Sequence, residues 1–518
     1  MLRRLAQQSG LYALVSVAAK LSGVVLLALY GDPAILPQAD FGFLGGLDAV
    51  KTLALLLAGA GLPLGVIRFA TASSLPPEQR AAVPATALVI AAVGGFLVGG
   101  LGWTFAPAVA AALLGDAALA TPVRWLSLYV ALRAIADVPY TQLRAEERAG
   151  WYALAGAAEA LVLVASVAYF LLVAEEGLLG VMKGYVVTAG VLAGVLTPLV
   201  FRRLSWRVDW GLVRPLLAFG LPLVLSGLAG RFLNVGDRVL ILRLLTPEAN
   251  AVYEWAARFG GIVNVFLVQS FQMAFTVLGL KALDASGQPD LHRRAFRHFA
   301  ALAGLAVLGL GLFLSDASRL LTDEAAYIGA DGLALLIGAG FAFYGLYVVT
   351  VNVLYAAGKT QLVAVGVACA AVGNAALNLL LIPRLGIAGA AVATLAAYAG
   401  LAVWTAGRAE RIVRAGYPWH AVVAVCVLVA GLWALAGPSA DWALVPRLAA
   451  RIGLLGLYLP LLVATGVYGR PDLDAVRAAL RSRRASTPPA PPGEAPDEGP
   501  GAAGPIEPPP EPPGAAVR

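Results

Sequence analysis

The chain reads Gly177-Leu178-Leu179-Gly180 and, 209 positions later, Gly386-Ile387-Ala388-Gly389. Three further pairs of segments recur at offsets of 210 or 211: Gly10-Leu11 and Gly220-Leu221, Asp40-Phe41-Gly42 and Ala251-Val252-Tyr253, and Leu143-Arg144-Ala145 and Leu354-Tyr355-Ala356. Four matches at nearly one offset indicate an internal repeat with few insertions between its copies. Internal repeats in a membrane protein are typical of secondary transporters, which bind their substrate between the two copies.

The composition is that of a membrane protein. Hydrophobic residues make up 60% of the chain, charged residues 13%, and the mean hydropathy is +0.81. One helical span of a bilayer takes about 20 predominantly apolar residues. Fourteen such spans are predicted, at residues 9–30, 42–67, 83–105, 122–142, 150–173, 177–201, 216–243, 252–279, 296–315, 328–356, 360–382, 386–406, 418–437 and 446–468. The predicted fold class is an all-α integral membrane protein with about 14 transmembrane helices.

The basic residues between the predicted spans indicate an orientation, because cytoplasmic loops are enriched in Lys and Arg. With the N-terminus inside, the inner segments before the tail carry eighteen Lys and Arg residues and the outer segments carry six. Several outer loops are acidic instead, such as the one with Glu175 and Glu176. We therefore expect a multi-pass protein with both termini in the cytoplasm. The net charge of +7 then reflects this topology and not nucleic-acid binding.

The repeat and the extra spans divide the chain into four parts. Six spans per copy is an even number, so both copies have the same orientation and are related by an axis along the membrane normal. The tail is rich in Pro, Gly, Glu and Ala, a composition that cannot bury a core and is typical of disorder. The predicted parts are an N-terminal lobe at residues 1–205 (spans 1–6), a C-terminal lobe at 206–415 (spans 7–12), two additional spans at 416–470, and a cytoplasmic tail at 471–518.

The sequence lacks the marks of a membrane-bound enzyme. No predicted loop is long enough to fold as a soluble domain, and the longest outer loop covers roughly residues 316–327. A membrane glycosyltransferase or glycan polymerase usually needs a sizeable outer domain with catalytic carboxylates. Cys369 and Cys426 lie in different spans, and the three histidines show no metal-ligand spacing. We therefore expect no catalytic residue, no metal site and no cofactor, and we predict that the protein is not an enzyme.

Charged side chains inside the spans are the candidate site residues, because each costs about 2.5–3.5 kcal/mol at mid-bilayer. Lys20 lies midway along the first predicted span and Arg231 midway along the seventh, so they occupy equivalent positions in the two copies. Neither has a carboxylate within one helical turn. An aqueous cavity and an anionic substrate would offset such charges, and Arg and Lys suit phosphate or pyrophosphate. The predicted substrate-binding residues are Lys20, Lys51, Arg231, Arg238 and Arg258.

Three carboxylates in the same spans are candidate sites for a coupling H⁺ or Na⁺, namely Asp48, Asp237 and Glu254. Transport would then draw on an ion gradient or on the membrane potential. The alternative is that Asp48 neutralises Lys51 (i, i+3) and Glu254 neutralises Arg258 (i, i+4) within their own helices. For four other charges in the spans, cavity lining and helix bridging are both open: Arg133, Asp137, Glu159 and Lys183.

One segment carries a resemblance to a known family. From Asn374 to Thr394 the chain reads NAALNLLLIPRLGIAGAAVAT, which closely resembles the LN-x-x-LIP-x-x-GI-x-GAA-x-AT signature of Wzx-type bacterial polysaccharide-biosynthesis flippases. These proteins belong to the multidrug/oligosaccharidyl-lipid/polysaccharide exporter (MOP) superfamily. Ala39-Asp40-Phe41-Gly42 and Gly236-Asp237-Arg238-Val239-Leu240 add to the similarity. The resemblance covers the fourteen predicted spans. It implies two pseudo-symmetric six-helix lobes that form a V around a central cavity, with two extra C-terminal helices.

The resemblance also implies a function. The expected cargo is an undecaprenyl-pyrophosphate-linked oligosaccharide, moved across the bacterial cytoplasmic (inner) membrane by alternating access for surface polysaccharide assembly. The expected partners are this lipid-linked oligosaccharide, the bilayer, and a glycan polymerase with other assembly proteins. A lipid II flippase for peptidoglycan has the same fold and cationic cavity and remains an alternative. A multidrug/cation antiporter is less favoured, because such proteins usually have twelve spans and acidic, aromatic sites.

Overall fold

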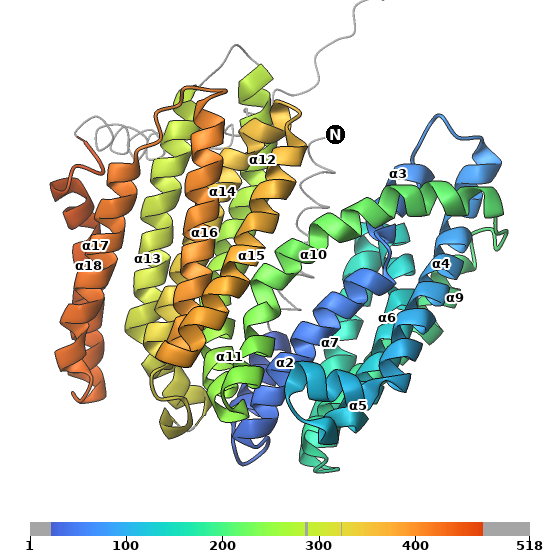
Figure 1. The fold of residues 1–518 in the computed structure, drawn as a ribbon, viewed down its shortest axis with the longest axis horizontal. Helices are drawn as coiled ribbons and strands as arrows, with labels where there is room; N and C mark the ends of the chain where they lie inside the picture. Colours follow the sequence, from blue (N-terminus) through green and yellow to red (C-terminus); the bar gives the residue numbers. More distant parts are fainter. Residues whose placement is uncertain (1–21, 285–288, 323, 470–518) are drawn as a thin grey trace, which may run out of the picture. The chain divides into compact units, whose positions relative to one another are not determined.

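The structure is a computed structural model that describes residues 22–284, 289–322 and 324–469. Every regular element in these ranges is helical (Figure 1). The α-helices are Ser22–Gly31, α2 (Gln38–Ala58), α3 (Leu62–Ala70), α4 (Pro77–Thr104), α5 (Ala106–Val109), α6 (Ala120–Ala145), α7 (Ala149–Leu172), α8 (Gly177–Val191), α9 (Thr197–Phe201), α10 (Val213–Leu244), α11 (Pro247–Ile262), α12 (Gln269–Asp284), α13 (Pro289–Leu321), α14 (Ala330–Ala356), α15 (Thr360–Leu385), α16 (Ile387–Glu410), α17 (Trp419–Ala436) and α18 (Leu444–Ala464). Short π-helical turns are η1 (Ala110–Leu114), η3 (Leu192–Leu196) and η5 (Val263–Val268), and short 3₁₀ turns are η2 (Ala117–Leu119), η4 (Trp210–Leu212), η6 (Glu324–Tyr327) and η7 (Gly437–Ser439).

Twelve helices in the described ranges are long and apolar enough to cross a membrane. They account for every predicted span except the first and the fourth. Most of the first span, including Lys20, lies outside the described residues, as does the predicted tail at 471–518. The fourth is α6, which is 26 residues long but carries Arg133 and Asp137 within its span. The all-helical membrane fold is confirmed, and the count of fourteen spans stays a prediction.

The two copies of the sequence repeat use the same helix pairings. In the N-terminal copy α4 packs on α6, α7 on α8, and α6 on α8. In the C-terminal copy α13 packs on α14, α15 on α16, and α14 on α16. The pairing of α2 with α6 likewise matches that of α11 with α14. The repeat of the sequence is therefore also a repeat of helix packing.

The two copies meet along α2, α10 and α11. α2 packs against both α10 and α11. Glycine at position 42 permits this approach, since a Cβ on Gly42 would overlap the carbonyl group of Pro247. The side chain of Asn250 donates from Nδ2 to the Gly42 carbonyl oxygen at 2.6 Å. Trp255 is fully buried at the same junction and stacks on Tyr327 with ring centroids 4.5 Å apart. Apolar packing and a buried hydrogen bond thus fix α11 against α2.

Helix α10 packs with both copies of the repeat. Just before and within its first turns, Leu212 and Leu216 join the core formed by α3, α4 and α6. Gly220 contacts the turn between α2 and α3, where Gly61 adopts a left-handed backbone with φ 71°. Other parts of α10 pack against α15, and Figure 1 shows the helix running from α11 to α3. The residues just after the predicted boundary at 205/206 therefore pack with the N-terminal copy.

The two helices beyond the repeat attach to α13. α17 packs on α13, and α18 packs on both α13 and α17. Asp316 on α13 forms an ion pair with Arg447 Nη2 at 2.7 Å and accepts a hydrogen bond from Arg451 Nη1, and both arginines lie on α18. Each arginine is only 6% exposed. One carboxylate between two buried guanidinium groups therefore connects α18 to the C-terminal copy.

Candidate functional site

A network of ion pairs joins the two copies where α2, α10 and α11 meet. Asp48 on α2 accepts a hydrogen bond from Lys51 Nζ, one turn further along the same helix, at 2.5 Å. Asp48 also accepts from Arg258 Nη2 on α11 at 3.4 Å. Arg258 in turn donates from Nε to Glu254 Oε1 at 2.9 Å. Arg258 therefore contacts a carboxylate from each copy.

The network continues onto α10. Arg238 donates from Nε to Glu254 Oε2 at 3.1 Å and from Nη1 to Asp237 Oδ1 at 2.7 Å. The hydroxyl of Tyr253 donates to the other carboxylate oxygen of Asp237. Both oxygens of Glu254 and both oxygens of Asp237 are thus engaged. We call the six charged residues the charge network: Asp48, Lys51, Asp237, Arg238, Glu254 and Arg258.

Pairing within helices and pairing between helices occur together in the charge network. Asp48 with Lys51 and Glu254 with Arg258 have the (i, i+3) and (i, i+4) spacings that place side chains on one helical face. Neither pair is closed, however, because Arg258 also contacts Asp48. Three cations and three carboxylates balance in formal charge. This balance offsets the cost of holding each charge inside the membrane.

Among the carboxylates of the charge network, the one on α2 is the most exposed. The exposed fraction of the side chain is 25% for Asp48 and 2% for Asp237. Aromatic rings cover the cations, with Lys51 Nζ lying 4.2 Å from the ring centroid of Tyr185. Of the three predicted coupling carboxylates, Asp48 is therefore the most accessible to an ion from solution.

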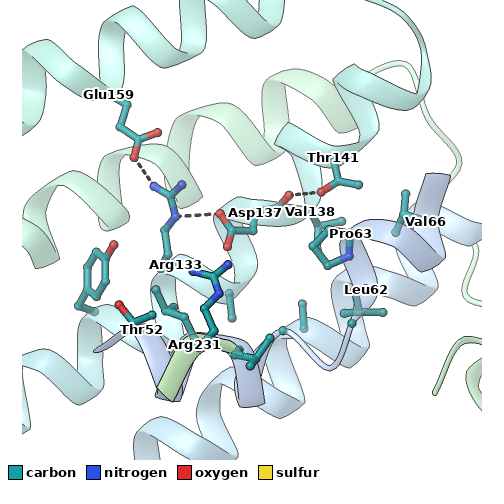
Figure 2. Close-up of a pocket in the computed structure, with 17 residues that line it drawn as sticks. Thr52, Leu62, Pro63, Val66, Arg133, Asp137, Val138, Thr141, Glu159 and Arg231 are labelled. Atoms are coloured by element: carbon teal, nitrogen blue, oxygen red, sulfur yellow. Dashed lines mark hydrogen bonds and ion pairs between the residues drawn. The ribbon is translucent and has the colours of Figure 1, made fainter. Parts of the chain in front are cut away.

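A polar cavity of about 380 Å³ lies next to the charge network and is lined by α2, α3, α4, α6, α7 and α10. Its lining includes Thr52, the residue that follows Lys51 on α2. Arg133 on α6 donates from Nε to Asp137 Oδ1 at 2.8 Å and from Nη1 to Glu159 on α7 (Figure 2). The Tyr140 hydroxyl donates to the second oxygen of Glu159 at 2.7 Å. Arg133, Asp137 and Glu159 thus line the cavity and bridge α6 to α7 at once.

Arg231 enters this cavity from α10. Its side chain is exposed, and it makes no ion pair or side-chain hydrogen bond with the part of the chain that the structure describes. Figure 2 shows the side chain pointing into the cavity toward Arg133 and Asp137. Arg231 belongs to the C-terminal copy, whereas the other lining residues belong to the N-terminal copy. The cavity therefore combines groups from both copies.

A second polar cavity, of about 490 Å³, continues along α6. It shares Arg133, Asp137 and Glu159 with the first cavity and extends to Arg144 and Tyr152. These last two residues flank the turn between α6 and α7, at the end predicted to face the cytoplasm. The polar surface therefore extends from the middle of α6 to this end.

The structure divides the predicted site residues into two groups. Lys51, Arg238 and Arg258 lie in the charge network with the three predicted coupling carboxylates. Arg231 lines the cavity instead, and Lys20 lies outside the described residues. Their roles in binding and coupling stay predictions.

Sequence reasoning did not select Arg133, Asp137 and Glu159 as site residues, although they form the polar centre of both cavities. The available signal was the four-residue spacing of Arg133 and Asp137 on a span of low hydropathy. Lys183, which was considered with them, instead pairs with Glu176 at 2.6 Å. It lies over the rings of Trp125 and Phe170 and lines neither cavity.

The fold matches solved membrane transporters. The structure is similar to "Lipid II flippase MurJ, inward closed conformation", with a TM-score of 0.67 and 11% identity over 89% of this chain and 100% of that one. It is also similar to an inward-facing multidrug resistance MATE family transporter of the MOP superfamily, with a TM-score of 0.63 and 15% identity over 77% of this chain and 95% of that one. At these identities the likeness shows the fold alone, and the long apolar helices and their order make it that of a multi-pass membrane protein.

The sequence identifies the family. Residues 5–276 match the family model described as "Polysaccharide biosynthesis protein". This match covers more than half of the chain, so the chain belongs to the polysaccharide biosynthesis protein family. The predicted membership is confirmed, although the segment from Asn374 to Thr394 that suggested it lies beyond the matched residues. A sequence comparison with curated proteins finds no match.

Proposed function

We propose that the protein is a flippase for undecaprenyl-pyrophosphate-linked oligosaccharides in the bacterial cytoplasmic membrane, with both termini in the cytoplasm. A charged glycan headgroup is costly to place in hydrocarbon, whereas its lipid tail can stay there. Passage through a polar cavity that opens alternately to each side avoids this cost. No covalent bond of the cargo is made or broken, so the protein acts as a transporter and not as an enzyme.

Arg231 is the observation that carries the proposal of an anionic cargo. Its guanidinium group lies in a polar cavity with no carboxylate partner in the described chain. A guanidinium group binds phosphate oxygens through two parallel hydrogen bonds, which suits a pyrophosphate. Because Arg231 comes from one copy and Arg133 from the other, a bound pyrophosphate would contact both copies. Such a ligand binds one arrangement of the copies better than another, as a conformational shift requires.

The rest of the polar surface suits a sugar. The carboxylates of Asp137 and Glu159 accept hydrogen bonds from hydroxyl groups, and the hydroxyls of Tyr140 and Thr141 both donate and accept them. All four residues line the second cavity, which extends toward the predicted cytoplasmic end. An oligosaccharide attached to a pyrophosphate at Arg231 would therefore meet hydrogen-bonding groups along α6 and α7.

Some contacts of the charge network must break when the cavity changes the side of the membrane to which it opens. Separating the copies at this end would part Arg258 from Asp48 and leave two charges without their partners. We propose that an H⁺ or Na⁺ gradient, or the membrane potential, acts through Asp48, the most exposed carboxylate of the network. Asp237 and Glu254 are the further candidates.

Lipid II is the second candidate cargo. The observation that favours it is the likeness in fold to the lipid II flippase, which extends over the whole of that chain. Lipid II carries the same pyrophosphate and a lipid tail, so Arg231 would serve it equally. The two cargoes differ in the headgroup beyond the pyrophosphate.

A translocation assay separates these candidates. Purified protein is reconstituted into liposomes that contain either a fluorescent undecaprenyl-pyrophosphate oligosaccharide or fluorescent lipid II, and a membrane-impermeant quencher reports transfer between leaflets. We expect faster transfer of the oligosaccharide-linked lipid. The R231A variant should lower the rate at least about tenfold, equivalent to losing one charge-assisted contact of about 1.4 kcal/mol or more.

A matched control variant is R384A. Arg384 is exposed, and within the described residues its side chain donates only to the Leu380 carbonyl oxygen of its own helix, at 2.8 Å. Its loss should leave the transfer rate unchanged. Faster transfer of lipid II would reassign the cargo, and an unchanged rate in correctly folded R231A would remove the cavity as the binding site.

A further inference from the structure

A third polar pocket lies at the shared end of α6, α7 and α9, away from the cargo cavities. Its volume is about 260 Å³, and it shares no lining residue with either cavity. Three arginines line it, Arg148, Arg202 and Arg203, together with Trp151. We call it the arginine pocket. No acidic residue lines it, so it carries an excess of positive charge.

The turn between α6 and α7 places Arg148 in the pocket. Glu147 adopts a left-handed backbone with φ 55°, which is uncommon for a residue other than glycine. The next residue then folds back, and the Arg148 N–H donates to the Leu143 carbonyl oxygen at 2.9 Å. The Arg148 guanidinium carbon lies 5.9 Å from the ring centroid of Trp151. Arg148 also forms a loose ion pair with Glu146, at 3.7 Å.

The other two arginines follow directly after α9. A π-helical turn at Leu192–Leu196 and Pro198 within the first turn of α9 set the course of this helix end. Arg202 and Arg203 are exposed and form no ion pair with the described residues. Two guanidinium groups are thus free to take an anionic ligand.

The pocket is apolar beneath its charged rim. Leu143, Leu196 and Val200 are buried within it, with at most 6% exposure. Trp151 and Leu199 at the rim are exposed by 43% and 40%. Two candidate membrane spans, Ala149–Leu172 and Gly177–Phe201, begin and end here, so the pocket lies at a membrane surface. A tryptophan at this depth is typical of the boundary between hydrocarbon and headgroups.

We propose that the arginine pocket binds the phosphate headgroup of an anionic membrane phospholipid such as phosphatidylglycerol. Basic pockets between transmembrane helices on the cytoplasmic side suit such headgroups. The phosphate contacts Arg202, Arg203 and Arg148, and the acyl chains follow the apolar surface of Leu199 and Val200 into the membrane. A zwitterionic lipid lacks the net charge, so the pocket discriminates between lipid headgroups. This site is independent of the identity of the transported cargo.

Quenching of tryptophan fluorescence by brominated lipids tests the proposal on the full chain in liposomes. The difference between wild type and W151F isolates the signal of Trp151. Brominated phosphatidylglycerol should quench this signal more than brominated phosphatidylcholine at equal mole fraction. In R202Q/R203Q, made with and without W151F, the preference for phosphatidylglycerol should fall about fivefold per arginine. The charge-retaining R202K/R203K pair should keep most of it.

The matched control is R411Q/R414Q, which removes two exposed arginines from the same predicted side of the membrane. It should leave the preference unchanged. The proposal is overturned if both lipids quench Trp151 of the wild type equally. It is also overturned if the control loses as much preference for phosphatidylglycerol as R202Q/R203Q. A third contrary result is that the pocket binds inorganic phosphate but does not distinguish phosphatidylglycerol from phosphatidylcholine. If R202Q/R203Q does not fold, the proposal is still tested by the comparison of the two lipids on the wild type and by the R202K/R203K variant.

Discussion

Arg258 and Asp48 lie 210 positions apart in the sequence, and Arg258 Nη2 is 3.4 Å from Asp48 Oδ2. This separation is within one residue of the repeat offset, so the two residues occupy nearly equivalent positions in the two copies. Equivalent positions can touch only close to the axis that relates the copies. An identical charge in both copies would be repulsive there, and the chain has an acid in one copy and a base in the other. The contact of α2 with α11 therefore lies at the pseudo-symmetry axis.

The first prediction concerns the strength of this contact. Both side chains are about a quarter exposed, at 24% and 25%, so solvent screens the pair in part. A double-mutant cycle of D48N and R258Q should give a coupling of about 0.5–1.5 kcal/mol in the free energy of unfolding in detergent. The surface pair Arg207–Glu78 has the same 3.4 Å separation but is 71% and 83% exposed. The cycle of R207Q and E78Q should give a coupling near zero, and equal couplings in both cycles would contradict our account.

The second prediction concerns Arg133, which serves two carboxylates. R133Q leaves Asp137 and Glu159 close together without the cation that pairs with both of them, whereas E159Q leaves Arg133 paired with Asp137. We expect R133Q to lower the free energy of unfolding by about 1–3 kcal/mol, and by more than E159Q does. The R133Q/E159Q double variant should recover part of the loss. Thermal unfolding in detergent measures all three, and a cost for E159Q that matches R133Q would show that no shared cation is involved.

The helix pairings could be predicted from the sequence because they follow from the repeat. Gly177 and Gly386 mark equivalent starts of α8 and α16, and the helices that precede them pair in the same way. One contact joins two segments that are predicted to lie on the same side of the membrane. Arg148 and Arg203 share a pocket, and both belong to predicted inner segments. The sequence repeat and the distribution of charged residues were therefore sufficient to predict the helical fold.

In the candidate site, the sequence could predict only the contacts between residues of the same helix. The pairs of Asp48 with Lys51 and of Glu254 with Arg258 follow from spacing along one helix. The pairing of Arg133 with Glu159 spans 26 residues and two helices, so it depends on how α6 packs on α7. The entry of Arg231 into a cavity of the N-terminal copy depends on the path of α10 across the junction. Side-chain spacing contains no information on either.

A third prediction concerns the attachment of α18. D316N removes the one carboxylate between two arginines that are 7% and 8% exposed at their side chains. Breaking a buried pair by removing one partner costs about 3–5 kcal/mol. We expect a loss of about 3 kcal/mol in the free energy of unfolding and faster proteolysis near the α17–α18 turn. D441N, at an exposed position in that turn, is the control and should change neither.

The fourth prediction tests the close approach of α2 to α11. A Cβ on Gly42 would overlap the Pro247 carbonyl group, so in G42A the two helices must move apart. Overpacking and the weakened bond from Asn250 to the Gly42 carbonyl should together lower the free energy of unfolding by about 2–4 kcal/mol. Transport should fall as well, because the same movement draws Arg258 away from Asp48.

Gly100 on α4 is the matched control for G42A. A Cβ at Gly100 meets no atom within 4 Å, so G100A should be neutral or slightly stabilising, as expected from the higher helix propensity of alanine. Thermal unfolding and the translocation assay are run on both variants. If G42A were as stable and as active as G100A, the two copies would not be in close contact at this point. The position of the symmetry axis at α2 and α11 would then be wrong.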